Sequence, residues 1–154
     1  MRMKLSILFA LLLGLGTLSA QNTALGVRAP RVRSFKPQIE EGNFLYMGFI
    51  HSPSRPCEIS APRVVELINN NDAISAVLFT REPQGDCEQW LIDLFSDGCQ
   101  VQMGADEIFQ KFGVEYAPFG VILDYKRRVL WQGNPQTLDK SKIENIIQQW
   151  TLQR

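Results

Sequence analysis

The stretch HSPSRPCEISAP, residues 51–62, overlaps the end of the apolar run FLYMGFIHS at 44–52. A near-continuous apolar run of this length is typical of a strand buried on both faces. Ser52 and Pro53 are turn formers, and apolar residues at helical spacing follow as far as about residue 70. The sequence therefore predicts a buried strand that turns directly into a helix from about Ser54, with Cys57 in the first turn.

The rest of the mature chain continues this alternation of strands and helices. Patterns of apolar residues predict a buried strand at 73–80, a helix at 86–95, a short strand at 99–103, a helix at about 105–112, two hairpin strands around 126–127 and a last helix capped by Asp139. In the helix at 86–95, Trp90 and Phe95 are expected in the core. The fold class is therefore α/β, with a central mixed sheet flanked by helices, a terminal β-hairpin and a C-terminal helix.

The first twenty residues have the three-part plan of a secretory signal peptide. Arg2 and Lys4 precede a short apolar run, and small and polar residues follow as far as Ala20. We expect cleavage before Gln21, an extracytoplasmic (periplasmic or secreted) mature protein, and no membrane anchor after cleavage, because no later apolar stretch could span a bilayer. Residues 21–43 are expected to form an irregular lead-in, with at most a short edge strand, to a domain over 44–154.

Composition argues against several classes of partner. The chain has 16 basic and 16 acidic residues, and removal of the signal peptide leaves a net charge near −2. That balance offers no electrostatic case for nucleic acid or an anionic membrane. Lys126, Arg127 and Arg128 are expected to form a solvated hairpin tip. With a single histidine and three cysteines, no metal site or cofactor is expected.

Three segments resemble the thioredoxin superfamily, in particular its exported TlpA-like branch. Residues 44–62 resemble the buried strand, the C-x-x-C motif at a helix start and the following Ala-Pro pair, with S-x-x-C in the motif position. Residues 112–133 resemble the family's cis-proline segment and terminal hairpin, and place Pro118 at the cis position. Residues 25–30, LGVRAP, resemble the opening of the exported branch. The resemblance implies a thioredoxin-like fold.

The same resemblance implies a degenerate redox site. In these proteins the first motif cysteine attacks as a thiolate at a helix N-terminus, and the second resolves the mixed disulfide. Ser54 occupies the attacking position and Cys57 the resolving one, and a serine hydroxyl cannot exchange with a disulfide. Gly48 stands where the family often keeps a buried acid, and Pro53 where it keeps an aromatic residue.

The cis-proline segment implies a groove for an extended peptide. Ala117 and Pro118, with Arg55 and Pro56 of the motif, are the expected groove residues, and Phe119 is expected to alter its shape. We therefore expect an exported thioredoxin-like protein, without standard dithiol activity, that holds a peptide or protein partner.

The alternative is an atypical thiol-disulfide oxidoreductase. It would use Cys57, which could form a mixed disulfide with a partner or simply be a shielded core residue. It could instead use Cys87 and Cys99, for which a structural disulfide, two buried thiols and a redox pair all remain open. Three cysteines cannot all pair within one chain.

Two other enzyme classes have less support. Ser54 is more simply a helix N-cap whose hydroxyl accepts a backbone hydrogen bond. A hydrolase would pair Ser54 with His51, but no orienting acid is evident in the sequence. A peroxidase would use Ser54 beside Cys57 together with an arginine that the sequence does not place.

Overall fold

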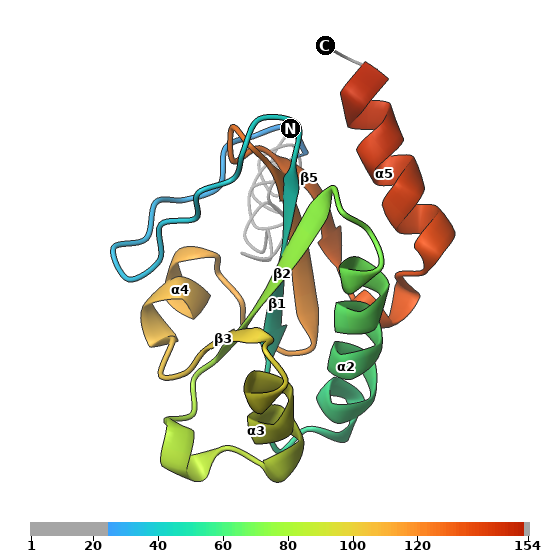
Figure 1. Cartoon of the computed structure of the whole chain (residues 1–154). Helices are drawn as coiled ribbons and strands as arrows, with labels where there is room; N and C mark the ends of the chain where they lie inside the picture. Colours follow the sequence, from blue (N-terminus) through green and yellow to red (C-terminus); the bar gives the residue numbers. More distant parts are fainter. Residues whose placement is uncertain (1–24, 153–154) are drawn as a thin grey trace, which may run out of the picture.

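A computed structural model of the chain describes residues 25–152, so the predicted signal peptide lies outside the described residues. A five-stranded sheet in the order β3-β2-β1-β4-β5 forms its centre (Figure 1). The strands are β1 Phe44–Ile50, β2 Ile74–Thr80, β3 Gln100–Gln102, β4 Phe119–Asp124 and β5 Val129–Gly133. The α-helices are α2 Arg55–Asn69, α3 Gln89–Ser96, α4 Asp106–Lys111 and α5 Lys140–Leu152, with 3-10 turns at Gln84–Asp86 and Pro135–Thr137.

The sheet is mixed, as predicted. Strands β1, β2 and β3 run parallel, whereas β4 is antiparallel to β1 and to β5. Helix α2 crosses over between β1 and β2, and the hairpin of β4 and β5 leads to α5. The α/β fold class, the terminal hairpin and the C-terminal helix are confirmed. Because parallel strands end at the same edge, the segments that follow β1 and β2 meet there.

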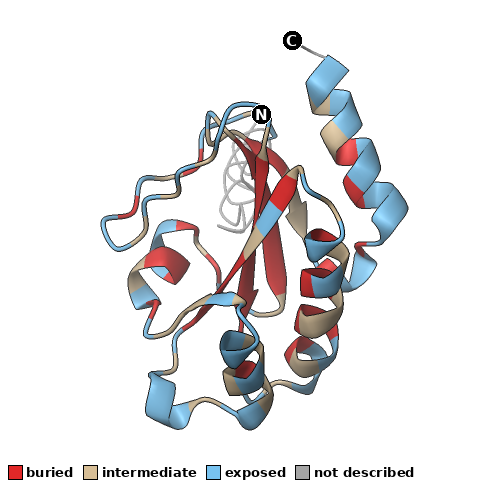
Figure 2. Ribbon diagram, in the orientation of Figure 1, coloured by how far each residue is buried: buried red, intermediate tan, exposed pale blue. Residues whose placement is uncertain are grey.

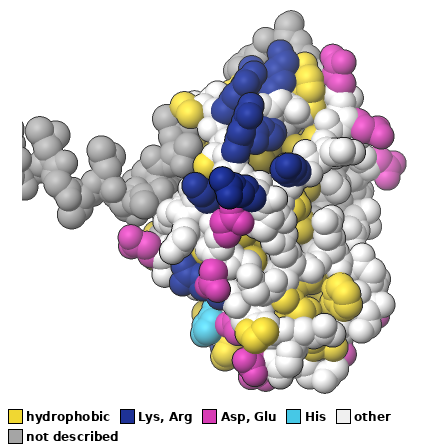
Figure 3. Space-filling model, turned by 90° about the vertical axis from the view of Figure 1, so that its left-hand side faces the viewer, with side chains coloured by type: hydrophobic (Ala, Val, Ile, Leu, Met, Phe, Trp, Pro, Cys, Tyr) yellow, Lys and Arg dark blue, Asp and Glu magenta, His cyan; other side chains and the backbone are white. Residues whose placement is uncertain are grey.

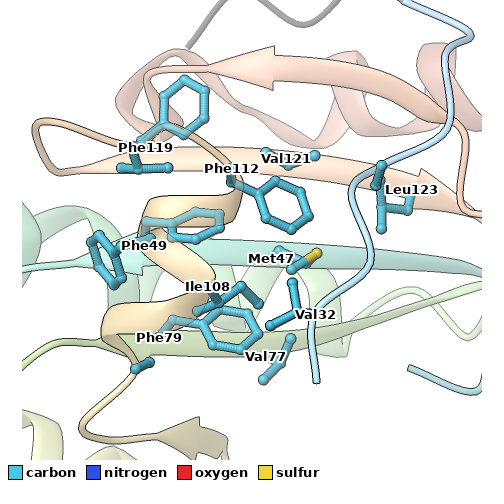
Figure 4. Packing of buried hydrophobic residues seen from close by; sticks show 14 of the residues in the cluster. Val32, Met47, Phe49, Val77, Phe79, Ile108, Phe112, Phe119, Val121 and Leu123 are labelled. Atoms are coloured by element: carbon cyan, nitrogen blue, oxygen red, sulfur yellow. The ribbon is translucent and has the colours of Figure 1, made fainter. Parts of the chain in front are cut away.

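The two faces of the sheet carry separate apolar cores. Strand β1 is buried along its whole length, and its side chains alternate between the faces. Leu45, Met47 and Phe49 point to the face covered by α4 and the lead-in (Figure 4). Phe44, Tyr46 and Ile50 point to the face covered by α2, α3 and α5. Figure 2 shows the result as a buried sheet beneath helices with exposed outer surfaces. Burial on both faces explains why β1 reads as a continuous apolar run.

The described part of the lead-in, residues 25–43, is irregular and packs against the sheet. Ala29 and Val32 are buried in the core on the α4 side, and Phe35 packs edge-on against Phe79 with ring centroids 4.9 Å apart. A single β-bridge joins Arg28 to Arg128 of the hairpin. These contacts fix the path of the lead-in across the sheet.

The helix predicted at 86–95 differs in its start and its burial. A 3-10 turn comes first and α3 begins at Gln89, because the buried Ser52 hydroxyl accepts the N–H of Glu88 at 2.5 Å. Phe95 is 47% exposed, so its predicted place in the core was wrong. Helix α3 buries only Leu91, and its neighbour β3 is a three-residue edge strand that offers little surface to cover Phe95.

Within residues 25–152, no helix has the length and apolar character needed to cross a membrane. The same residues contain no cluster of three or more His, Cys, Asp and Glu side chains that could hold a metal ion.

Candidate functional site

Ser54 occupies the N-cap position of α2 but does not cap it through its side chain. Its backbone is extended, with φ −78° and ψ 122°, and its N–H donates to the His51 carbonyl at 2.9 Å. The predicted hydrogen bond from a helix N–H to its hydroxyl is absent, so that prediction was wrong. An N-cap side chain accepts from the second or third helical residue. The second is Pro56, which has no N–H to donate.

Cys57 is fully buried, with no exposed surface. It lies on the inner side of α2, among apolar residues of the core on that face of the sheet. The backbone N–H of His51 donates to its Sγ at 3.4 Å. The one sulfur of the motif is thus shielded by helix, sheet and turn together. A disulfide in another molecule has no path to it while the native structure holds.

Two glycines form the floor beneath the motif. Gly48 of β1 lies opposite Gly120 of β4, and the Tyr46 ring packs against both. A Cβ added at Gly48 would lie 2.6 Å from a Leu78 methyl carbon and 3.0 Å from the Tyr46 ring. The position at which the family often keeps a proton-relay acid is therefore filled by an aromatic ring and a leucine. Burial raises the pKa of Tyr46 far above its ordinary value, with nearby Arg63 opposing the shift, so the phenol stays neutral.

The cis-proline segment lies beside the motif. The peptide bond between Ala117 and Pro118 is cis, and β4 begins at the next residue. The register pairs Phe119 with Phe49, which places Pro118 next to the end of β1, where the chain turns into α2. Phe119 is 5% exposed and its ring centroid lies 6.2 Å from that of Phe49. The expectation that Phe119 shapes the groove was wrong, because the alternation of β4 turns its side chain into the core.

A pocket of about 270 Å³ opens between these segments. It is lined by Ile50, His51, Ser54, Arg81, Phe109, Glu115, Tyr116 and Ala117. Of the predicted groove residues, only Ala117 lines this pocket, together with Ser54. Arg55 and Pro56 are exposed on the first turn of α2, and Arg55 forms an ion pair with Glu58 at 2.8 Å. The wall of the pocket comes instead from the segments after β1 and β2 and before β4.

A further acid, Glu82, contacts His51 of this pocket and was not predicted from the sequence. The carboxylate of Glu82 lies against Nδ1 of His51, and it also accepts the hydroxyl of Thr80. The side chain of Glu82 is 14% exposed and that of His51 is 62% exposed. Only the strand order could have indicated this contact. Strands β1 and β2 are parallel neighbours with Ile50 opposite Thr80, so the residues just beyond both strands lie close together.

Cys87 and Cys99 are not joined. All three cysteines are free thiols in the structure, so the structural disulfide considered for this pair is absent. Cys87 Sγ lies 3.4 Å from the Pro83 carbonyl, whereas Cys99 Sγ contacts the carbonyl of Gln100 beyond the other end of α3. Burial raises the pKa of both thiols, and for Cys87 the carboxylates of Glu82 and Asp86 add to the effect. Neither thiol is activated as a nucleophile.

Comparison with known proteins identifies the fold. No family model and no curated protein sequence matches the chain. Among solved structures, a thioredoxin-like protein from Parabacteroides distasonis is similar at 10% identity and a TM-score of 0.64, covering 81% of this chain and 95% of that one. A secreted Mycobacterium tuberculosis disulfide oxidoreductase, described as homologous to E. coli DsbE, is 15% identical with a TM-score of 0.55, covering 70% and 81%. StoA from Bacillus subtilis is 11% identical with a TM-score of 0.52, covering 70% and 84%.

The chain therefore has the thioredoxin-like fold, and the resemblance carried by residues 44–62 and 112–133 is confirmed at the level of fold. One of these solved structures is described as that of a disulfide oxidoreductase. The structure places Ser54, Cys57 and Pro118 around one end of the sheet.

Proposed function

We propose that this is an exported thioredoxin-like protein that holds an extended peptide or a partner protein beside Pro118 and has lost dithiol exchange. The observation that carries the proposal is the state of the motif: a hydroxyl at the attacking position, Ser54, and the only motif sulfur, Cys57, fully buried. A scaffold that keeps the groove and lacks the nucleophile is suited to binding without turnover.

The pocket supports binding as the retained role. Its volume of about 270 Å³ suits a single side chain, with apolar Ile50 and Phe109 beside polar His51 and Glu115. Tyr116 lies at its edge with 64% of its surface exposed. Exposed aromatic residues are common at the centres of recognition sites, because they supply contact area at little entropic cost. An extended peptide laid along the cis-proline segment would insert one side chain here.

The alternative, an atypical thiol-disulfide oxidoreductase, has less support from these residues. Cys57 would have to become exposed before it could attack or be attacked. Cys87 and Cys99 are unpaired, and the raised pKa of each thiol disfavours the reactive thiolate. A peroxidase would meet the same obstacle at Cys57.

Export is part of the proposal. The leader-like sequence at 1–20 supports it, as does the description of one structurally similar protein as secreted. N-terminal sequencing of the protein secreted from an expressing cell tests it, with a new N-terminus at Gln21 as the expected result.

A peptide-binding measurement tests the groove. The mature protein is passed over an array of extended peptides, and the bound sequences are then titrated with a Tyr116→Ala variant. We expect binding of selected peptides and at least a tenfold loss with Tyr116→Ala. The matched control is Leu152→Ala, an apolar residue at the end of α5 that is 76% exposed. No binding, or equal loss with both variants, would contradict the proposal.

A further inference from the structure

Basic side chains from three separate segments gather on one face of the molecule (Figure 3). They come from the lead-in, the end of α4 and the hairpin between β4 and β5. We call this set the basic face, and its members are Arg28, Arg31, Arg33, Lys36, Lys111, Lys126 and Arg127. All are exposed except the half-buried Arg127. The set exists only in the folded chain, because its members lie up to about a hundred positions apart in sequence.

These charges have few neutralising neighbours, and the clearest is Glu107, whose pKa is lowered first by a hydrogen bond from the backbone of Arg33 and in part by the charge of Lys111. Within the part of the chain that the structure describes, none of the seven forms an ion pair. Few acidic residues lie nearby, and two of them already have hydrogen-bond or ion-pair partners. Glu107 accepts the backbone N–H groups of Arg33 and Ser34 at 3.0 and 3.2 Å, and the buried Asp124 pairs with Arg128 at 2.6 Å. Glu40 at the margin is the remaining carboxylate among the lining residues. A strong positive field therefore faces solvent.

The basic face is hollowed as well as charged. A hollow of about 660 Å³ is lined by Arg31, Arg33, Lys36 and Lys111 together with Glu107. A second hollow of about 580 Å³ shares Arg31 and extends to Arg28, Lys126 and Arg127. Four of the seven cations are arginines, whose guanidinium groups bind phosphate through two parallel hydrogen bonds. Each hollow thus offers several cations to a phosphate group.

Two exposed apolar side chains lie just before Arg28 of the basic face in the chain. Leu25 is 64% exposed and Val27 is 50% exposed. They are held outward by a fixed backbone: Gly26 N–H donates to the Val129 carbonyl at 2.7 Å, and Val129 N–H donates to the Val27 carbonyl at 2.9 Å. Apolar side chains presented beside a cluster of cations are the pattern of proteins that lie on a membrane surface.

We propose that the basic face docks on the surface of an anionic phospholipid bilayer. The cations would bind headgroup phosphates, and Leu25 and Val27 would enter the boundary between headgroups and acyl chains. The cis-proline groove lies at the other end of β4 from the hairpin, so it would stay open to a partner while the protein is docked. The proposal does not depend on the proposed function of that groove.

Nucleic acid and acidic proteins fit these observations less well. Binding of single-stranded nucleic acid uses aromatic side chains on which bases stack. Tyr125 is the one aromatic residue that lines either hollow among the described residues. The buried centre of a protein interface is usually depleted of charged residues, whereas here seven cations make up the face. A bilayer requires only charge with a shallow apolar edge.

Vesicle co-sedimentation of the mature protein tests the proposal. We expect binding to vesicles of phosphatidylglycerol and phosphatidylcholine in equal parts at low salt, loss of binding as NaCl is raised, and no binding to pure phosphatidylcholine. Absence of binding to the anionic vesicles at low salt, or equal binding to both kinds of vesicle, would overturn it. Polyglutamate and duplex DNA are titrated in parallel. If either binds more tightly than the anionic vesicles, the face serves that class of partner and the proposal is wrong.

Paired charge reversals locate the contact. Each cation near an anionic surface contributes roughly a fivefold factor to partitioning, so Arg31→Glu/Lys36→Glu should weaken binding by at least about 25-fold. The matched control is Lys140→Glu/Lys142→Glu at the start of α5, which changes net charge equally and should alter binding less than about twofold if docking is local. Equal losses in the two variants would overturn the proposal, since net charge alone would then govern binding. Thermal melts verify that both variants are folded.

The contribution of the apolar residues Leu25 and Val27 is tested with a separate variant. Leu25→Ser/Val27→Ser should weaken vesicle binding several-fold, while leaving its salt dependence and any residual binding of polyglutamate unchanged. If this variant binds vesicles as tightly as the wild type does, nothing enters the bilayer and the docking geometry is wrong.

Discussion

At Ser54 the chain carries a hydroxyl where the resemblance expects an attacking thiolate, and three residues later Cys57 is packed out of reach of solvent. The floor below them is equally changed, because Tyr46 and Leu78 fill the space above Gly48. A sulfur at residue 54 would restore the attacking group, but catalysis would stay slow because the floor carries no acid to assist proton transfer. These single-residue features carry the proposed loss of redox activity.

Burial of Cys57 predicts a graded reaction of the three thiols. In the native protein Cys57 should resist alkylation by iodoacetamide, whereas the half-buried Cys87 and Cys99 should react slowly. Their pKa values are raised, so the thiolate fraction is small at neutral pH and the rate should climb only above the ordinary range of cysteine. Mass spectrometry of timed samples between pH 7 and pH 10 measures this. Modification of Cys57 as fast as Cys87 would contradict the described burial.

The side chains of Leu78 and Tyr46 lie so close to Gly48 that a larger residue would fit there only if they shifted. Gly48→Ala would force the added Cβ against Leu78 and Tyr46, and overpacking of this kind costs about 1–3 kcal/mol of the free energy of unfolding. Urea denaturation measures the loss. Gly85→Ala is the matched control, since a Cβ there meets nothing within 4 Å, and it should leave the midpoint nearly unchanged. A wild-type midpoint in Gly48→Ala would show that the floor can relax.

At the scale of elements, the two long helices begin in different ways. In α5 the Asp139 carboxylate accepts the N–H of Lys142 at 2.8 Å, which confirms the predicted cap. In α2 the corresponding hydroxyl of Ser54 is unused, because Pro56 removes one of the two donors. The same N-cap position is therefore energetically important in one helix and not in the other.

This difference predicts a contrast between two alanine substitutions. Asp139→Ala should cost about 1 kcal/mol of the free energy of unfolding, the usual value of a lost cap, whereas Ser54→Ala should cost only a few tenths. Chemical denaturation of both variants measures the two changes in the free energy of unfolding. An equal cost would mean that Ser54 caps α2 in solution.

Helix α2 also contains an unsatisfied polar atom. Ser60 is 1% exposed, and its hydroxyl has no hydrogen-bond partner among the described residues. Ser60→Ala removes this desolvated group and improves helix propensity, so it should stabilise the protein by about 1 kcal/mol. The same denaturation experiment measures the gain. Destabilisation instead would show that the hydroxyl has a partner in solution.

The elements themselves were largely predictable from the sequence. Strands β1 and β2 read as apolar runs because they are buried on both faces, and Asp139 marked the start of α5. The first residue of α3 could not be predicted from the sequence. It depends on a hydrogen bond between Ser52 and Glu88, which lie 36 positions apart. Patterns within a short stretch of sequence cannot indicate a contact between residues this far apart.

At the scale of the whole molecule, the fold separates two surfaces. The motif and the cis-proline segment lie at one end of the sheet, and the hairpin of the basic face lies at the other end of β4. The pairing of His51 with Glu82 and the gathering of cations both follow from strand order and the path of the lead-in. Neither feature could be predicted from the spacing of residues in the sequence. The net charge of the chain is near zero, so composition did not indicate that cations gather on one face.

The central claim is that the motif no longer exchanges disulfides, and catalysed reduction of insulin by dithiothreitol tests it most directly. The mature wild type should be no faster than the reaction without protein, and Cys57→Ala should behave identically. Ser54→Cys restores a sulfur at the helix start, where the thiolate is stabilised, and should bring measurable catalysis. Wild-type turnover that disappears in Cys57→Ala would contradict the account.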